Sequence, residues 1–296
     1  MRLRTAAGVA AAAAGLVGPF MEPLFPVLRR ATIPVLPAGS PPLRLLHVSD
    51  LHLLPRHGRR SQWIRRLADL RADVVVSTGD HISSAAAIPL LAATLAALTA
   101  DATPGLFVPG NNDYYSPTRP SFAAYLSPGP PVKRGPDLPW AQAVRALELV
   151  GWSDLTHRRQ SLIVHGVPLV LAGTDDAHLR RDHYERIAGP VEAGAVGIGV
   201  THTPQRRLLS RFSADGFRLL LAGHTHGGQL RLPGLGPLVT NCDLPRSRAR
   251  GLTRGPDGGW LHVSAGLGTS PYAPIRLFCR PEVSLLTLVG SGSLGT

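Results

Sequence analysis

Five short apolar segments of this chain each end in polar residues of the kinds that bind metal ions. The apolar segments alternate with stretches of helical spacing, as at 61–70 and 85–98, and such alternation predicts β-α-β units on a buried sheet. In a sheet of this kind the strand ends meet in one crevice, which brings together residues far apart in sequence. The five polar segments are Asp50-Leu51-His52, Gly79-Asp80, Gly110-Asn111-Asn112-Asp113, His202 and Gly223-His224-Thr225-His226.

The strands expected before these polar segments cover 43–48, 74–77, 106–108, 197–201 and 218–222. We also expect a hairpin from 161–164 and 168–172, strands at 260–264 and 283–288, and a helix at 140–150. The chain has 296 residues and is 44% hydrophobic, which suffices for one large domain with a buried core. The sequence therefore predicts one principal α/β domain.

The side chains of the five segments are of the kinds that bind divalent metal ions. Carboxylate, amide and imidazole groups suit Mn, Fe, Zn or Co, and the lack of cysteine in these segments argues against a structural zinc site. Asp50 and His52 project on the same side of an extended segment and can hold one ion. His224 and His226 can each face a different ion, with Asp80 as the natural bridge. Two ions about 3.5–4 Å apart can activate a bridging hydroxide for attack on phosphorus, so the pattern predicts phosphoester hydrolysis.

The charge of the chain indicates anionic partners. It carries 31 basic and 19 acidic residues, a formal net charge of +12, which raises the local concentration of anions such as phosphorylated substrates. The arginines are scattered and are not interleaved with aromatic residues, so no nucleic-acid partner is expected. Cys242 and Cys279 are the only cysteines, and the sequence leaves open whether they pair.

The amino terminus differs from the rest of the chain. Arg2 and Arg4 precede an apolar stretch at 6–21, which is typical of a signal anchor. We therefore expect residues 1–30 to anchor the protein at a membrane surface, with cleavage and secretion as the alternative. Four prolines in 31–42 predict a linker, followed by the domain at 43–290 and a frayed tail at 291–296.

Taken together and in this order, the five segments resemble the signature of calcineurin-like metallophosphoesterases. The longer string from Gly223 to Gln229, with 266–270 and 274–276, is similar to the bacterial membrane-associated branch of that family. The resemblance covers about 43–288. It implies a four-layer αββα sandwich, in which two mixed sheets are flanked by helices.

The resemblance also implies a centre of two divalent ions, Mn, Fe or Zn, with the following ligands. One ion would be held by Asp50, His52, Asp80 and His226. The other would be held by Asp80, Asn111, His202 and His224. Some relatives in this branch cleave the pyrophosphate of UDP-2,3-diacylglucosamine, so a phosphodiester or pyrophosphate substrate, including a lipid-linked one, is implied by analogy.

Asn112 departs from the family pattern, which has histidine at this position as the acid that protonates the leaving oxygen. An amide cannot donate a proton in that sense, although it can hydrogen-bond a phosphoryl oxygen. General acid catalysis contributes about 10²–10⁴-fold, so we expect selectivity for good leaving groups. His81, Tyr114 or Tyr115 could supply the proton instead. The alternative is a metal-binding scaffold of the same fold with impaired catalysis.

Two further residues complete the candidate site. Asp113 is grouped with Asn112 as a catalytic candidate, and its simplest role is to support a ligand or cap the loop. Arg276 is a candidate for binding the substrate phosphate. The sequence does not indicate the oligomeric state.

Overall fold

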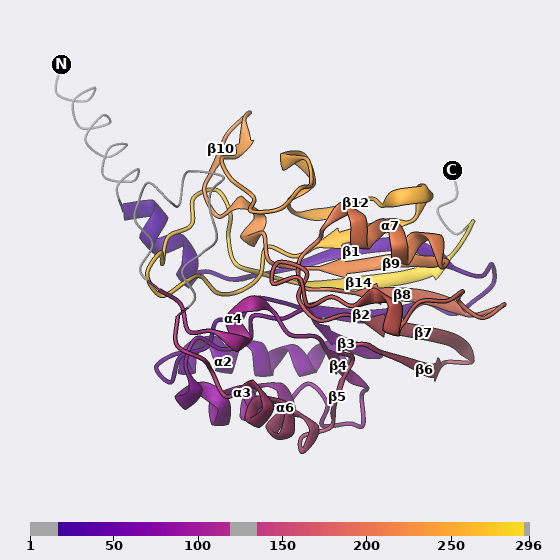
Figure 1. Ribbon diagram of the computed structural model, residues 1–296, viewed down its shortest axis with the longest axis horizontal. Coiled ribbons are helices and arrows are strands. Elements are labelled where there is room, and N and C mark those ends of the chain that lie inside the picture. Colours follow the sequence, from indigo (N-terminus) through magenta and orange to yellow (C-terminus); the bar gives the residue numbers. More distant parts are fainter. Residues whose placement is uncertain (1–16, 119–134, 293–296) are drawn as a thin grey trace.

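The computed structural model describes residues 17–118 and 135–292. Two six-stranded sheets face each other, and helices cover their outer faces, as Figure 1 shows. Three hydrophobic clusters separate the resulting four layers. This arrangement confirms the predicted four-layer α/β sandwich.

The first sheet has the strand order β1-β14-β2-β3-β4-β5. Its strands are β1 (Val27–Leu36), β2 (Leu43–Val48), β3 (Val74–Ser77), β4 (Gly105–Phe107), β5 (Trp152–Asp154) and β14 (Glu282–Gly290). β14 pairs antiparallel with β2 and parallel with β1, and the other neighbours are parallel. The sheet is therefore mixed.

The second sheet has the order β12-β13-β9-β8-β7-β6. Its strands are β6 (Arg158–Val164), β7 (Val167–Gly173), β8 (Val196–Val200), β9 (Phe217–Ala222), β12 (Gly251–Arg254) and β13 (Trp260–Val263). The outer pairs β6·β7 and β12·β13 are antiparallel and the inner pairs are parallel. A small ribbon of β10 (Arg231–Leu232) and β11 (Gly236–Pro237) lies outside both sheets.

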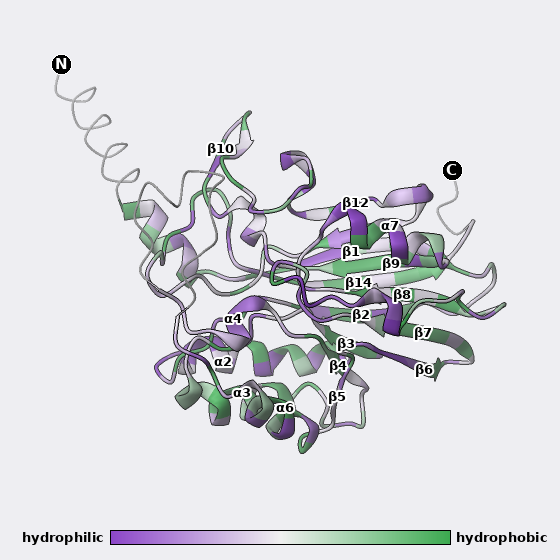
Figure 2. Ribbon diagram, viewed as in Figure 1, coloured by the Kyte–Doolittle hydropathy of each residue, from purple (hydrophilic) through white to green (hydrophobic). Residues whose placement is uncertain are grey.

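The helices cover the sheets through their apolar faces. The α-helices are α2 (Gly58–Arg65), α3 (Ile88–Ala96), α4 (Asn111–Tyr114), α6 (Trp140–Glu148) and α7 (Arg206–Ala214). Helices α2, α3 and α6 pack on the first sheet through Ile64, Leu91 and Leu147, and α7 packs on the second through Leu208 and Phe212. Figure 2 shows hydrophobic residues concentrated along central strands such as β9 and β14. Burial of these residues is the main force that holds the layers together.

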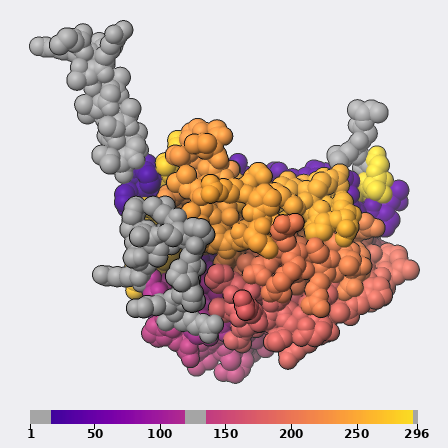
Figure 3. Space-filling model, turned by 45° about the horizontal axis from the view of Figure 1, so that its top comes forward, coloured from indigo at the N-terminus to yellow at the C-terminus, as the bar shows by residue number. Residues whose placement is uncertain are grey.

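Residues 31–36, which we expected to be part of a linker, lie within β1. This strand pairs with β14 along its length, and its side chains Ile33 and Leu36 are buried between the sheets. Pro34, the one proline within β1, does not prevent this, because β1 is an edge strand and an edge position needs no N–H donor on its outer side. Figure 3 shows the consequence, with N-terminal residues beside C-terminal ones at one end of the molecule.

The expected membrane localisation is contradicted. Among residues 17–118 and 135–292, no helix combines the length and the apolar character needed to cross a membrane. Of the anchor predicted at 1–30, residues 1–16 lie outside the described residues, and residues 27–30 lie in β1. Residues 17–21 belong to its apolar stretch. There, the carbonyl of Pro19 accepts a hydrogen bond from the backbone N–H of Arg276 at 2.8 Å.

Candidate metal centre

The predicted ligands lie in the loops that follow strands of both sheets. Asp50 and His52 follow β2, Asp80 follows β3, and Asn111 begins α4 after β4. His202 follows β8, and His224 and His226 follow β9. The strand ends therefore place residues from all five sequence segments at one edge of the sandwich, as expected.

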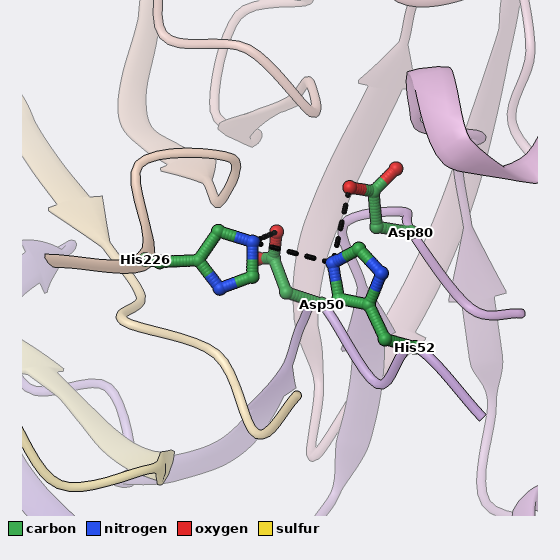
Figure 4. Close-up of side chains that lie close together, drawn as sticks. All are labelled: Asp50, His52, Asp80 and His226. Atoms are coloured by element: carbon green, nitrogen blue, oxygen red, sulfur yellow. Dashed lines mark hydrogen bonds and ion pairs between the residues drawn. The ribbon is translucent and has the colours of Figure 1, made fainter. Parts of the chain in front are cut away.

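Four of these residues form a compact group, shown in Figure 4. One ligand atom from each of Asp50, His52, Asp80 and His226 lies within 4.8 Å of the others. His52 Nε2 is 3.4 Å from Asp80 Oδ2 and 3.2 Å from His226 Nε2, and His226 Nε2 is 3.6 Å from Asp50 Oδ1. Two carboxylates and two imidazoles at these spacings can hold one divalent ion.

Two of the remaining predicted ligands, His202 and His224, lie beside the other oxygen of Asp80. Asp80 Oδ1 is 3.5 Å from His202 Nε2, which is 3.3 Å from His224 Nδ1. The side-chain oxygen of Asn111 is buried and has no hydrogen-bond partner among the described residues. A buried acceptor without a donor is costly, and a cation would satisfy it. The two oxygens of Asp80 thus face two separate groups of candidate ligands.

Hydrogen bonds on the outer side of each ring set the tautomers of the histidines. Three of the four rings face a backbone carbonyl, which can only accept, so at His202 and His224 the nitrogen on that side carries the proton. At His226 the same nitrogen also lies 3.3 Å from the guanidinium of Arg276, which can only donate. The pairs are His202 Nδ1 with Thr78 O at 2.7 Å, His224 Nε2 with Asn241 O at 3.2 Å and His226 Nδ1 with Gly268 O at 3.2 Å. His52 Nδ1 lies 3.3 Å from the hydroxyl of Ser83. The inner nitrogens of His202 and His224 keep the lone pair that coordination requires.

The backbone at these ligands is unusual. Five of the seven have positive φ: Asp50 at 50°, His52 at 44°, Asp80 at 54°, His224 at 67° and His226 at 49°. This left-handed region is sparsely populated by residues with a Cβ and persists only where surrounding structure enforces it. Close packing of Gly223 against Ser49 and Asp50 helps to hold this backbone, and only glycine fits there because a Cβ would collide with both residues. Residues held in this way at one site indicate function.

Burial and neighbouring charges shift the pKa values at the site. Burial raises the pKa of Asp50 to about 6 and lowers the pKa of His224 to about 3. Burial alone raises the pKa of Asp80 and lowers that of His202, but their mutual attraction outweighs it and holds Asp80 well below and His202 well above the usual range. A cation that takes the place of the His202 proton would therefore bind less tightly at low pH.

Asn112 and Asp113 both contact the ligand loops but differ in exposure. The backbone N–H of Asn112 donates to Asp80 Oδ1 at 2.8 Å and its amide donates to Oδ2 at 2.7 Å. Asp113 is fully buried and accepts from His81 Nδ1 and from the backbone N–H groups of His81, Ile82 and Gly110. Asp113 therefore ties the loop after β3 to the loop after β4, and we assign it a role in positioning these loops instead of in catalysis.

Arg276 does not face a substrate. It is 0% exposed, and its guanidinium donates to the carbonyls of Ala265 at 2.7 Å, Gly266 at 3.1 Å, Gly268 at 2.6 Å and Cys279 at 3.2 Å. A phosphate could reach it only by disrupting these bonds. Its contacts place it behind His226, 3.3 Å from Nδ1, which fits support of the ligand loops better than the expected binding of phosphate.

Several residues near the site were not predicted from the sequence. His178 lies with its ring 5.0 Å from that of His224 and lines a surface pocket of about 610 Å³ together with Arg180, Arg207 and Arg211. Ser49 and Thr78 hydrogen-bond behind Asp50. The sequence could have suggested Ser49 and Thr78, because each lies within two residues of a predicted ligand.

Comparisons with known proteins agree with this geometry. The family model for calcineurin-like phosphoesterases matches residues 43–228. The Bacillus subtilis protein YpbG is 25% identical over 252 residues, which cover 85% of this chain and 83% of the relative. A metallophosphoesterase of Aquifex aeolicus is 28% identical over 268 residues, 87% and 89% of the two chains. The Escherichia coli phosphodiesterase YaeI is 36% identical over 98 residues, 33% of this chain and 34% of its own.

Proposed function

This chain belongs to the calcineurin-like phosphoesterase family, and on that premise we propose that it hydrolyses phosphodiester or pyrophosphate bonds at a centre of two divalent metal ions. Its membership of the metallophosphoesterases, and hence of the hydrolases, follows from the family and from relatives that carry that name. The observation that supports the dinuclear centre best is Asp80, whose two oxygens face two different groups of ligands.

We propose the ligand sets implied by the sequence. Asp50, His52, Asp80 and His226 hold one ion, and Asp80, Asn111, His202 and His224 hold the other. The inward lone pairs of His202 and His224 and the unpartnered oxygen of Asn111 support this assignment. When bound, two such ions activate a water for attack and offset the charge of the phosphoryl oxygens.

The chain's own residues bear on the choice of substrate. Asn112, at the position of the expected proton donor, holds Asp80 and can hydrogen-bond a phosphoryl oxygen but cannot protonate a leaving group. Two of the three alternative donors, His81 and Tyr114, are engaged elsewhere. His81 is buried between Ser77 and Asp113, and the Tyr114 hydroxyl donates to Asp175 at 2.9 Å. The preferred substrate is therefore one whose leaving group needs no proton, such as a pyrophosphate or an aryl ester.

The test uses the full chain, stripped of metal and reloaded with Mn²⁺, with bis-p-nitrophenyl phosphate as substrate. We expect metal-dependent turnover that Asp80→Ala abolishes, while the control Asp101→Ala, at an exposed loop position, leaves turnover unchanged. Mn²⁺ binding is measured alongside by calorimetry. Binding of two ions without turnover would favour the impaired scaffold, and turnover that survives in Asp80→Ala would refute the proposed centre.

A second experiment narrows the substrate. Rates are compared for a nucleoside diphosphate sugar, its lipid-linked analogue UDP-2,3-diacylglucosamine and an alkyl phosphodiester. We expect pyrophosphates to be cleaved at least about 10²-fold faster than the alkyl ester, the lower bound of what a general acid contributes. Equal rates on all three would refute selection by leaving group.

A further inference from the structure

A continuous chain of buried hydrogen bonds lies behind the candidate ligand Asp50. It starts at His262 on β13 of the second sheet, passes to His47 on β2 of the first, and ends at the Asp50 carboxylate. The contacts are His262 Nδ1 to His47 Nδ1 at 2.8 Å, His47 Nε2 to Thr78 Oγ1 at 2.9 Å, Thr78 Oγ1 to Ser49 Oγ at 2.7 Å and Ser49 Oγ to Asp50 Oδ2 at 2.5 Å. Every member is at most 3% exposed.

The direction of every bond in this chain follows from its end. An ionised carboxylate only accepts, so Ser49 donates its single hydroxyl hydrogen to Asp50. Ser49 must then accept from Thr78, and Thr78 must accept from His47 Nε2. A neutral imidazole that donates through Nε2 accepts through Nδ1, so His262 has to donate through its own Nδ1.

We propose that Ser49, Thr78, His47 and His262 are positioning residues for the metal centre, with His47 protonated at Nε2 and His262 protonated at Nδ1. The inference rests on the proposed function in that Asp50 is taken as a metal ligand. The hydrogen-bond chain engages Oδ2 of Asp50 and leaves Oδ1 facing His226, 3.6 Å from its Nε2. It orients the carboxylate from behind, as carboxylate and carbonyl partners do for ligating histidines in metal sites.

The surroundings of the two histidines support this role. Burial holds the pKa of His47 well below its usual range and lowers that of His262 to about 4, so both rings are neutral and one nitrogen of each can accept. In a buried chain of this kind each bond polarises the next. Because every donor points towards Asp50, the aligned bonds increase the positive potential that the Ser49 hydroxyl hydrogen presents to the Asp50 carboxylate.

Thr78→Val tests the chain, because it removes the hydroxyl while keeping the shape of the side chain. We expect the affinity of the metal-stripped protein for Mn²⁺ to fall about 10–100-fold in calorimetry, the usual loss when an outer partner of a ligand is removed. The matched control is Thr94→Val, another fully buried threonine that bonds to the α3 backbone and to Ser61. Unchanged Mn²⁺ affinity in folded Thr78→Val would overturn the proposal.

A second measurement reads the tautomers in the parent chain itself. Nitrogen-15 NMR of the metal-free protein labelled in histidine reports which ring nitrogen carries the proton, with His47→Gln and His262→Gln used only for assignment. We expect Nε2–H for His47 and Nδ1–H for His262, and the opposite tautomer at either would overturn the proposal. This readout is independent of turnover, so a protein without phosphoesterase activity would refute the proposed function while leaving the tautomers testable.

Discussion

Replacing Arg276 with methionine should destabilise both the fold and the metal centre. The change keeps much of the aliphatic volume but removes the guanidinium, which serves the carbonyls of Ala265, Gly266, Gly268 and Cys279. The carbonyls of Ala265 and Cys279 then lose their donor, whereas Gly266 keeps the N–H of Glu282 and Gly268 keeps its contact with His226. Loss of Arg276 also frees Gly268, whose oxygen faces His226 Nδ1.

The size of the effect follows from the number of bonds. A buried acceptor left unsatisfied costs about 1–3 kcal/mol, and the partners that Gly266 and Gly268 keep hold the sum below four full penalties. We therefore expect the free energy of unfolding to fall by about 3–5 kcal/mol, the range found when one partner of a buried charged network is removed. At about 2–4 °C per kcal/mol, the midpoint of thermal unfolding should fall by roughly 6–20 °C.

Thermal and urea unfolding followed by circular dichroism measure this loss, and calorimetry with Mn²⁺ measures the effect on His226. The matched control is Arg44→Met, at an exposed position of β2, where we expect a change within about 0.5 kcal/mol. If Arg276→Met unfolded like the parent chain and changed only the KM for substrate, Arg276 would be a substrate-binding residue and the structural argument would fail.

Three further predictions address the missing general acid, the pH dependence of the free energy of unfolding and the place of β1 in the fold. Asn112→His should raise kcat/KM on alkyl phosphodiesters by about 10²-fold or more, with little change on aryl esters; an equal change on both classes would contradict the missing-acid account. Because burial lowers the pKa of His262 from 6.5 to about 4, the unfolded chain binds more protons between these values. The free energy of unfolding is therefore about 3 kcal/mol higher above pH 6.5, where His262 is neutral in both states, and this difference is lost towards pH 4. Urea unfolding of the metal-free chain should show a shallower pH dependence in His262→Gln but not in the exposed control His165→Gln. Ile33→Ala should cost about 2–5 kcal/mol in thermal unfolding and the exposed Arg30→Ala of the same strand almost nothing, whereas equal small effects would mean that β1 is a linker after all.

Local patterns in the sequence predicted the α/β class and the ligand loops, and the family resemblance added the four-layer sandwich. Apolar runs gave the central strands, and the polar residues just past their ends gave Asp50, Asp80 and His202. Strand β1 was missed because the four prolines within 31–42 suggest a linker, and its pairing with β14 shows that it belongs to the sheet.

The contacts behind the ligands could not be predicted in the same way. Arg276 lies 50 residues from His226, and His262 lies 215 residues from His47. No periodicity or motif indicates which face such a side chain takes when it is buried. The role of Arg276 changed from substrate contact to loop support only once its burial was known.

The left-handed backbone at Asp50, His52, Asp80, His224 and His226 sets a conflict between durability and activity. Each such residue costs on the order of 1 kcal/mol or more that the rest of the fold must offset, and glycine would adopt the same φ without that cost. A search for more heat-resistant variants by stability alone would therefore favour replacement of the very side chains that we propose as metal ligands. Any improvement of this protein has to be sought away from these five positions, or selected for metal binding at the same time.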